Sequence, residues 1–365
     1  MGRDDDASSS YPWPDVDVRD WGPPRPPFPV TPVYRPRPDL ARLGAAVHGR
    51  IEANVLDADD GAPDALRAKR VRLEAWPQRC VALDPALADD ADGVWARVRD
   101  AAVALAATGP GGGGPDAPIA PIVRLGAELH ARAAGWAFPA DPARPFALRP
   151  LRPDAAPVID WILSRPAAER PLHALGLALQ EDLAWMESDD PAEPARARLL
   201  HVCWPSGWSP ADKVGRDFAS IHAPVADAAM LRAAALPLSR ALTTQGPFVR
   251  FVWTVAPDGA RSRHPDEIGD RPAASAAAEP WFRCERQVSL PLPAPAEGPG
   301  RGGRALFLIR LHVAPLAEVA STPERLATLR DALASMSPAT LAYKGLDARV
   351  DALVRWIDAR LGGHG

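Results

Sequence analysis

The chain is poor in lysine, asparagine, tyrosine and cysteine. Only three of its 42 basic residues are lysine, and it holds one asparagine, three tyrosines and three cysteines. The cysteines, Cys80, Cys203 and Cys284, form no Cys-x-x-Cys metal pair, and their scattered positions indicate no disulfide framework. We therefore expect a reducing environment, and the cytoplasm is the simplest location.

Long apolar runs and an excess of basic charge are also missing. No apolar run reaches the ~18 residues that span a bilayer, and the acidic start MGRDDDASSS resembles neither a secretory signal nor a transit peptide. The net charge of −4 provides no electrostatic footprint for nucleic acid or an anionic membrane surface. We therefore expect no nucleic acid and no membrane among the partners.

The glycines give little support to nucleotide binding. GPGGGGPDAP at 109–118 lacks the Lys-Ser/Thr of a phosphate-binding loop, and no Rossmann glycine fingerprint is present. This stretch is either a linker between domains or a surface insertion. We expect a Pro-rich extended segment over 1–38 and a single α+β domain over 39–365 that contains the Gly-rich loop.

Hydrophobic periodicity predicts helices first, a meander of strands later, and helices to close. Helical patterns cover 92–107, 119–134, 156–163, 171–186, 225–242, 321–335 and 347–361. Strand patterns cover 198–204, 248–255, 282–292 and 305–313. Because loops rather than long helices connect the last three strands, we expect an antiparallel sheet flanked by helices.

The segment CWPSGWSPADKVGRDFASIHAPV, at 203–225, has the composition of a site rather than of a plain helix or strand. Its turn sequence carries Trp204 and Trp208, and Pro224 follows closely after His222. The segment also contains Lys213, one of the few lysines. Since an ammonium and a guanidinium are not interchangeable at a shaped site, we interpret the rare lysines as functional candidates, with a solvated surface lysine as the alternative.

Four pieces of sequence, taken in order, resemble the haem-dependent oxidative N-demethylase-like family. They are Gln180-Glu181-Asp182; Pro205-Ser206-Gly207-Trp208 with Lys213, Gly215 and Ile221-His222-Ala223-Pro224-Val225; Arg283-Cys284-Glu285-Arg286-Gln287; and Tyr343-Lys344-Gly345. The resemblance runs from roughly residue 170 to residue 355. Family members often carry Asn-Trp before the third piece, whereas this chain has Arg250-Phe-Val252-Trp253.

The resemblance implies a PAS-like α+β fold that binds a b-type haem and its iron. It implies an oxidoreductase that oxidises a small N-methylated amine with oxygen and draws electrons from a separate flavin and iron–sulfur reductase. The alternative is a PAS-like protein that binds haem or another small molecule without catalysis, as a sensor or carrier, because a shared fold does not carry function with it.

His222 is the metal ligand that the resemblance implies. Haem iron takes a strong axial ligand, most often a neutral imidazole whose second nitrogen is oriented by a hydrogen bond. Of the eight histidines, His222 alone lies inside the family-like signature. The alternative is that His222 caps a helix or packs in the core, since Pro224 also suits the first turn of a helix.

The polar triplet on the 282–292 strand supplies two further candidates. Arg286 would hold a haem propionate, because a guanidinium pairs bidentately with a carboxylate. Glu285 would accept an amine proton or neutralise a cationic substrate. Since successive strand residues point to opposite faces, the alternative is that either Arg286 or the pair Glu285 and Gln287 forms only a salt bridge on the sheet surface.

The remaining candidates are polar or aromatic. Lys213 and Lys344 would contact propionates or another anion as point charges. Tyr343 would donate a hydrogen bond to an iron-bound ligand, or else cap the edge of the sheet. Trp208, with other tryptophans, would form a wall beside a flat cofactor or an alkylated amine, or else belong to the core.

Overall fold

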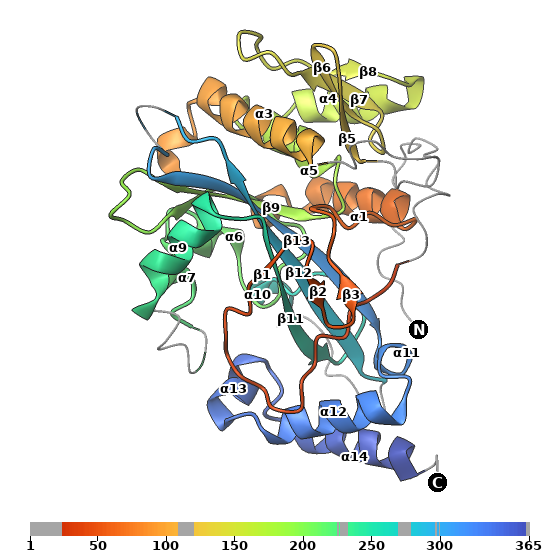
Figure 1. The fold of residues 1–365 in the computed structure, drawn as a ribbon. Coiled ribbons are helices and arrows are strands. Elements are labelled where there is room, and N and C mark those ends of the chain that lie inside the picture. Colours follow the sequence, from red (N-terminus) through yellow and green to blue (C-terminus); the bar gives the residue numbers. More distant parts are fainter. Residues whose placement is uncertain are drawn as a thin grey trace.

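A seven-stranded antiparallel sheet forms the centre of the protein (Figure 1). The computed structural model describes residues 24–108, 120–224, 226, 233–268, 279–295, 298 and 300–362. In sheet order the strands are β1 (Ala41–Arg42), β11 (Phe248–Ala256), β12 (Trp281–Leu292), β13 (Gly303–Pro315), β9 (Asp182–Ser188), β10 (Arg196–His201) and β4 (Val81–Leu83). Every neighbouring pair is antiparallel. The prediction of an α+β fold with an antiparallel sheet flanked by helices is confirmed.

Two smaller sheets and a set of helices surround the central sheet. The small sheets are β2 (Ala46–Val47) with β3 (Arg50–Ile51), and β5 (Ile122–Leu125), β6 (Glu128–Ala131), β7 (Trp136–Pro139) and β8 (Arg149–Pro150). The helices are α1 (Ala62–Ala75), α2 (Pro77–Cys80), α3 (Ala91–Ala107), α4 (Ala156–Leu163), α5 (Arg170–Gly176), α6 (Pro210–Lys213), α7 (Phe218–Ile221), α9 (Ala235–Thr244), α10 (Pro265–Ile268), α11 (Leu316–Val319), α12 (Pro323–Ala334), α13 (Pro338–Tyr343) and α14 (Val350–Gly362). Two 3-10 turns, η1 (Pro85–Leu87) and η2 (Pro153–Ala155), complete them.

One face of the large sheet carries two apolar cores. Trp185 and Leu306 lie beneath α3, α5 and the four-stranded sheet. Toward the other end of the same face, Trp253 and Phe282 pack against α12 and α14. The opposite face carries a smaller apolar cluster around Ala184 and is bordered by α6, α7 and α9. This second, less covered face is where the candidate site lies.

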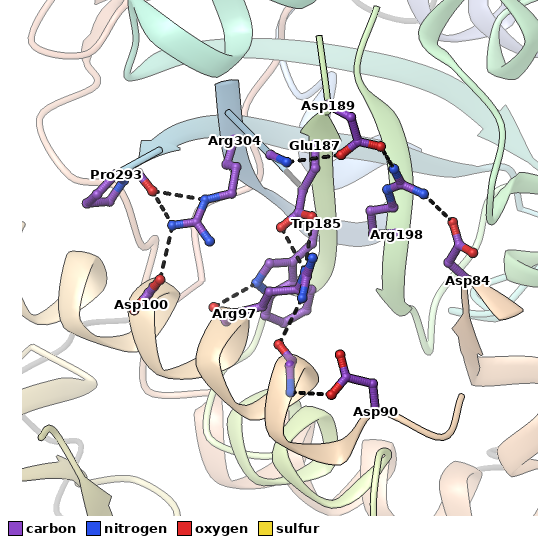
Figure 2. A network of polar contacts seen from close by, with 12 residues as sticks. Asp84, Asp90, Arg97, Asp100, Trp185, Glu187, Asp189, Arg198, Pro293 and Arg304 are labelled. Carbon is purple, nitrogen blue, oxygen red and sulfur yellow. Dashed lines mark hydrogen bonds and ion pairs between the residues drawn. The ribbon is translucent and has the colours of Figure 1, made fainter. Parts of the chain in front are cut away.

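Charged side chains connect α3 to the sheet (Figure 2). Glu187 on β9 is 1% exposed, and each of its carboxylate oxygens lies 3.0 Å from Nε of Arg97 on α3. Arg304 on β13 reaches the Asp100 carboxylate of the same helix at 3.0 Å. The buried Trp185 donates from Nε1 to the Arg97 carbonyl at 3.3 Å. The helix is therefore held by paired charges as well as by apolar contacts.

Most predicted elements agree with the structure. The helices over 92–107 and 156–163 and the two near the C-terminus are present, as are all four predicted strands, with boundaries that differ by a few residues. For the predicted helix over 225–242, α9 accounts for the second half, while 225 and 227–232 lie outside the described residues. The predicted Gly-rich loop at 109–118 also lies outside them.

The predicted helix over 119–134 is wrong. This stretch forms the hairpin β5–β6, with Ile122 paired to Ala131 and Leu125 to Glu128. Gly126 in the connecting turn has a φ of +61°, a conformation that favours glycine and interrupts a helix. The side chains Ile122, Leu129 and Ala131 are buried beneath α3, so tertiary packing overrides the local helical preference.

The predicted helix over 171–186 is wrong in its second half. Helix α5 ends at Gly176, and β9 begins at Asp182. Strand β9 lies between β10 and β13 and bonds to both, so its backbone groups are satisfied by the sheet. Gly176 also packs closely on His201, because a Cβ at this position would lie 2.3 Å from the imidazole Nδ1.

Candidate functional site

His222 ends the short helix α7 with its imidazole fixed in one orientation. Asp217 caps the start of this helix, accepting from the Ser220 amide at 2.8 Å. The His222 ring lies 4.2 Å, centroid to centroid, from the ring of Phe218, and Nδ1 lies 2.7 Å from the Phe218 carbonyl oxygen. Because a carbonyl only accepts, Nδ1 carries the proton and donates. The lone pair is therefore on Nε2, which has no hydrogen-bond partner within the described residues.

Burial keeps the His222 imidazole neutral. The loss of solvation lowers its pKa from the usual 6.5 to about 4, and the bond to the Phe218 carbonyl opposes this effect only in part. The positive charges of Arg250 and Lys213 lower the pKa further. At neutral pH the ring is uncharged with its Nε2 lone pair available, which is the state that coordinates a metal.

Lys213 supports the end of α7. It lies at the end of α6, and its Nζ donates to the Ile221 carbonyl, one residue before His222, at 2.9 Å. Partial burial lowers the pKa of this lysine. An ammonium has three N–H donors, so the bond to Ile221 leaves two for another acceptor.

The sheet face beside His222 carries the polar residues of β11 and β12. Glu285 and Gln287 lie on this face, and Gln287 Nε2 donates to Glu285 Oε2 at 2.7 Å. Arg250 lies directly across from Gln287 on β11. Its Nε is buried without a hydrogen-bond partner, and its guanidinium makes no ion pair in the part of the chain that the structure describes. Arg250 is thus a cation close enough to both His222 and Glu285 for its charge to act on them.

Arg286 lies on the opposite face of the sheet from Glu285 and is 2% exposed. Its Nε lies 2.7 Å from the buried Glu52 carboxylate, and its two Nη atoms donate to the carbonyls of Val55, at 3.1 Å, and Asn54, at 2.5 Å. The structure therefore does not bring Arg286 to the face of His222. It anchors residues 52–55 instead, because pleating turns neighbouring strand residues to opposite sides.

Lys344 and Tyr343 lie at the outer edge of the sheet, beside β11. Lys344 Nζ donates to the Trp253 carbonyl at 2.5 Å and lies 4.7 Å from the ring centroid of Tyr34. Burial lowers the Lys344 pKa to about 8. The Tyr343 residue as a whole is 50% exposed. Its pKa is raised, first by the loss of solvation at the hydroxyl and second by the negative charge of Glu285. Lys344 Nζ also lies 5.1 Å from the ring centroid of Trp253, which belongs to the core on the opposite face, so Lys344 lies at the sheet edge with the charge of Glu285 still acting on both residues.

Apolar side chains line the face between the sheet and α7. Trp208, half-buried, packs with Val214, Ile221, Met186 and Phe307 around the small cluster on this face. All of these are only partly buried although they lie over the central strands. The surface is apolar at its centre and carries charged groups at one edge.

Trp204, in the 203–225 segment, and Asp182, on β9, have structural positions. Trp204 is 7% exposed and belongs to the core on the other side of the segment. Asp182 accepts hydrogen bonds from the amides of Cys203, at 3.0 Å, and Trp204, at 2.8 Å. Asp182 therefore anchors the start of the segment through its main chain.

Sequence reasoning missed Arg250 as a candidate for the site. Its signal was available, because Arg250 is the one charged residue in the apolar strand pattern FVRFVWTV. Alternation places it on the same side as Val252, and only the strand register shows that this side is the face of Gln287 and Glu285.

Comparison with known proteins places the chain in a family. No curated protein matches it, and within the described residues no helix is long and apolar enough to cross a membrane. The family model described as haem-dependent oxidative N-demethylase, alpha subunit-like, matches residues 157–354, more than half of the chain. This match includes β9 to β13 and the segment that carries His222, and the chain belongs to the haem-dependent oxidative N-demethylase alpha subunit-like family.

Proposed function

We propose that the protein is a haem-dependent oxidoreductase that removes a methyl group from a small N-methylated amine. Oxygen would be the oxidant and a separate flavin and iron–sulfur reductase the source of two electrons. In the overall reaction one oxygen atom leaves in formaldehyde and the other in water, and the amine gains a hydrogen in place of its methyl group. The observation that carries this proposal is the orientation of His222 by the Phe218 carbonyl, in a chain of this family.

The residues on this face fit a b-type haem. His222 would bind the iron through Nε2, since its Nδ1 is committed to the Phe218 carbonyl. The partly buried apolar surface around Trp208 would contact the flat ring. Arg250 would pair with a propionate, because its buried Nε otherwise has no partner among the described residues. When bound, the haem supplies oxygen activation and electron transfer, which no side chain of the protein provides.

Lys213 and Lys344 would add positive charge for the propionates. Each already donates one hydrogen bond to a carbonyl, of Ile221 and Trp253 respectively, and each keeps two N–H donors. Their carbonyl bonds fix the ammonium groups in place, so they would act as preorganised point charges. Arg286 is not included in this set, because Glu52 and two carbonyls occupy its guanidinium.

Glu285 and Tyr343 would act on the substrate. Glu285 Oε2 accepts from Gln287, which leaves Oε1 to accept from the N–H of an alkylammonium and to take its proton, so that the neutral amine reacts. Tyr343 would donate its hydroxyl hydrogen to an acceptor at the same face. Both residues are close enough to Arg250 to interact with its charge, so the substrate amine would lie beside the propionate edge of the haem.

Hemin titration tests the axial ligand. The wild-type protein should give a saturable Soret band, and His222→Ala should lose the spectrum of an imidazole-ligated haem. His130→Ala, on β6 in the separate small sheet, is the matched control and should bind hemin as the wild type does. A wild-type protein that ignores hemin would exclude both the enzyme and a haem sensor.

Turnover separates enzyme from sensor. The haem-loaded protein, with a ferredoxin-type reductase and dimethylamine, should release formaldehyde in proportion to oxygen consumed. Glu285→Gln should keep the Soret band and lose most of the turnover. A protein that binds haem through His222 and produces no formaldehyde from any small N-methylated amine would be a carrier or sensor.

A further inference from the structure

Tyr34 joins the N-terminal segment to the outer edge of the large sheet. Its main-chain amide donates to Ser335 Oγ at 2.8 Å. Its ring meets that of Trp253, on β11, edge-on with 6.1 Å between the centroids, and the Lys344 ammonium lies 4.7 Å from the Tyr34 ring centroid. These contacts hold the side chain beside β11, although Tyr34 precedes residues 157–354, the part of the chain that the family model matches.

The Tyr34 hydroxyl lies near the charged groups of the face that carries Arg250 and Glu285. The pKa of Tyr34 is raised to about 12, first by loss of solvation and second by the neighbouring Tyr343, while the positive charge of Arg250 acts in the opposite direction. The hydroxyl is therefore protonated at neutral pH and can donate a hydrogen bond. It forms no hydrogen bond within the described residues.

Arg250 likewise presents donors that have no acceptor. Its Nε is buried without a hydrogen-bond partner. Glu285 and Asp39 are the carboxylates whose charges act on it, yet Arg250 forms an ion pair with neither in the described chain. Glu285 accepts from Gln287 at 2.7 Å, and Asp39 is exposed. Because a buried donor without an acceptor is costly, Arg250 and Tyr34 together lack an acceptor that a ligand would supply.

We propose that Tyr34 and Arg250 hold one propionate of the haem between them. An ionised carboxylate has two oxygens and only accepts, so it can take N–H donors from the guanidinium and the O–H of the phenol at the same time. Hydrogen bonds of this charged kind are short and strong. The inference rests on the haem binding proposed above, and it adds to that site a residue of the N-terminal segment. The Tyr343 hydroxyl remains the donor for the substrate side of the face.

Hemin and hemin dimethyl ester form a matched pair of probes, since they share the ring and the iron and the ester lacks free carboxylates. Soret titrations of the full chain give the dissociation constant of each. Tyr34→Phe keeps the ring contacts with Trp253 and Lys344 and removes only the hydroxyl. We expect it to weaken hemin binding about tenfold, through the loss of one hydrogen bond to a charged group, and to bind the ester as the wild type does. Arg250→Met should also weaken the binding of hemin alone.

Phe28→Leu is the control for the position of the N-terminal segment. Phe28 lies in the same segment, packs against Phe282 with 5.8 Å between the ring centroids, and carries no side-chain donor. This variant should bind both probes as the wild type does. The inference is overturned if Tyr34→Phe binds hemin as tightly as the wild type, if it weakens the binding of hemin and of the ester equally, or if Phe28→Leu reproduces its effect. A wild-type protein that binds neither probe refutes the proposed haem function itself, whereas wild-type binding with any of these three results refutes only the role of Tyr34.

Discussion

Replacing Arg286 by methionine should make the protein much less stable. The fraction that stays folded should bind haem with unchanged affinity. Arg286 and Glu52 are 2% and 1% exposed, and their ion pair is 2.7 Å long. Breaking a buried ion pair costs about 3–5 kcal/mol, and the lower end applies here, because the Glu52 carboxylate keeps a second cation, Arg50, at 2.5 Å. The carbonyls of Asn54 and Val55 also lose their donor, about 1 kcal/mol each. We expect the free energy of unfolding to fall by roughly 5 kcal/mol.

The matched control is Arg250→Met, on the neighbouring strand and the opposite face. The Arg250 guanidinium has no hydrogen-bonded partner in the described structure, so its loss should change the free energy of unfolding by no more than about 1 kcal/mol. Urea titrations give the free energies of unfolding. Hemin titrations at urea concentrations below the unfolding midpoint give the dissociation constants of haem. Arg250→Met should bind hemin more weakly, whereas Arg286→Met should not.

A double-mutant cycle makes the Arg286 result specific. If the ion pair is responsible, Arg286→Met combined with Glu52→Gln should be less destabilised than the sum of the two single changes, since no buried charge is left alone. An Arg286→Met protein that is as stable as the wild type and binds hemin weakly would contradict this role of the ion pair. That outcome would restore Arg286 as the propionate partner that the family resemblance implies.

Two further predictions concern the buried side of the sheet. Gly176→Ala should destabilise the protein by about 1–3 kcal/mol, because the added Cβ would lie 2.3 Å from His201 Nδ1. The control is Gly362→Ala, which should be harmless because a Cβ there meets no atom within 4 Å. Equal melting temperatures of the two variants would contradict this prediction. Burial lowers the pKa of both His201 and His173, so the unfolded chain binds more protons below about pH 6.5 and stability should fall as the pH drops from 7 to 5. His201→Gln should flatten this dependence, and a wild-type unfolding free energy that is constant over the range would show that the imidazoles are not neutral in the fold.

The sequence predicts the fold well where local pattern and tertiary demand agree. The strands at 248–255, 282–292 and 305–313 alternate in chemistry or are apolar throughout, and their short connections determine an antiparallel meander. The stretch 171–186 is different, because an apolar run of this length suits both a helix and a central strand. The choice depends on neighbours on both sides of β9, which are distant in sequence.

The candidate site was predictable in its composition and less so in its geometry. His222, Glu285 and Lys213 are distinguished by motif and by rarity, and the structure places them around one face. Whether Glu285 or Arg286 belongs to that face depends on strand register, which alternation alone leaves open. The partner of Arg286 is Glu52, 234 residues away in sequence, and no local pattern connects such a pair.

The three lysines of the chain share a structural role that the interpretation of rare lysines as functional candidates did not include, since each donates to main-chain carbonyls. Lys69, which is fully buried, donates to the carbonyls of Gly176, at 3.2 Å, and Leu179, at 3.0 Å. Lys213 and Lys344 also donate to main-chain carbonyls. A compact ammonium points its three N–H groups in different directions from one atom, whereas a guanidinium such as that of Arg286 directs its donors within one plane. The lysines thus hold carbonyls at a point, and at Lys213 that point is the turn that carries His222.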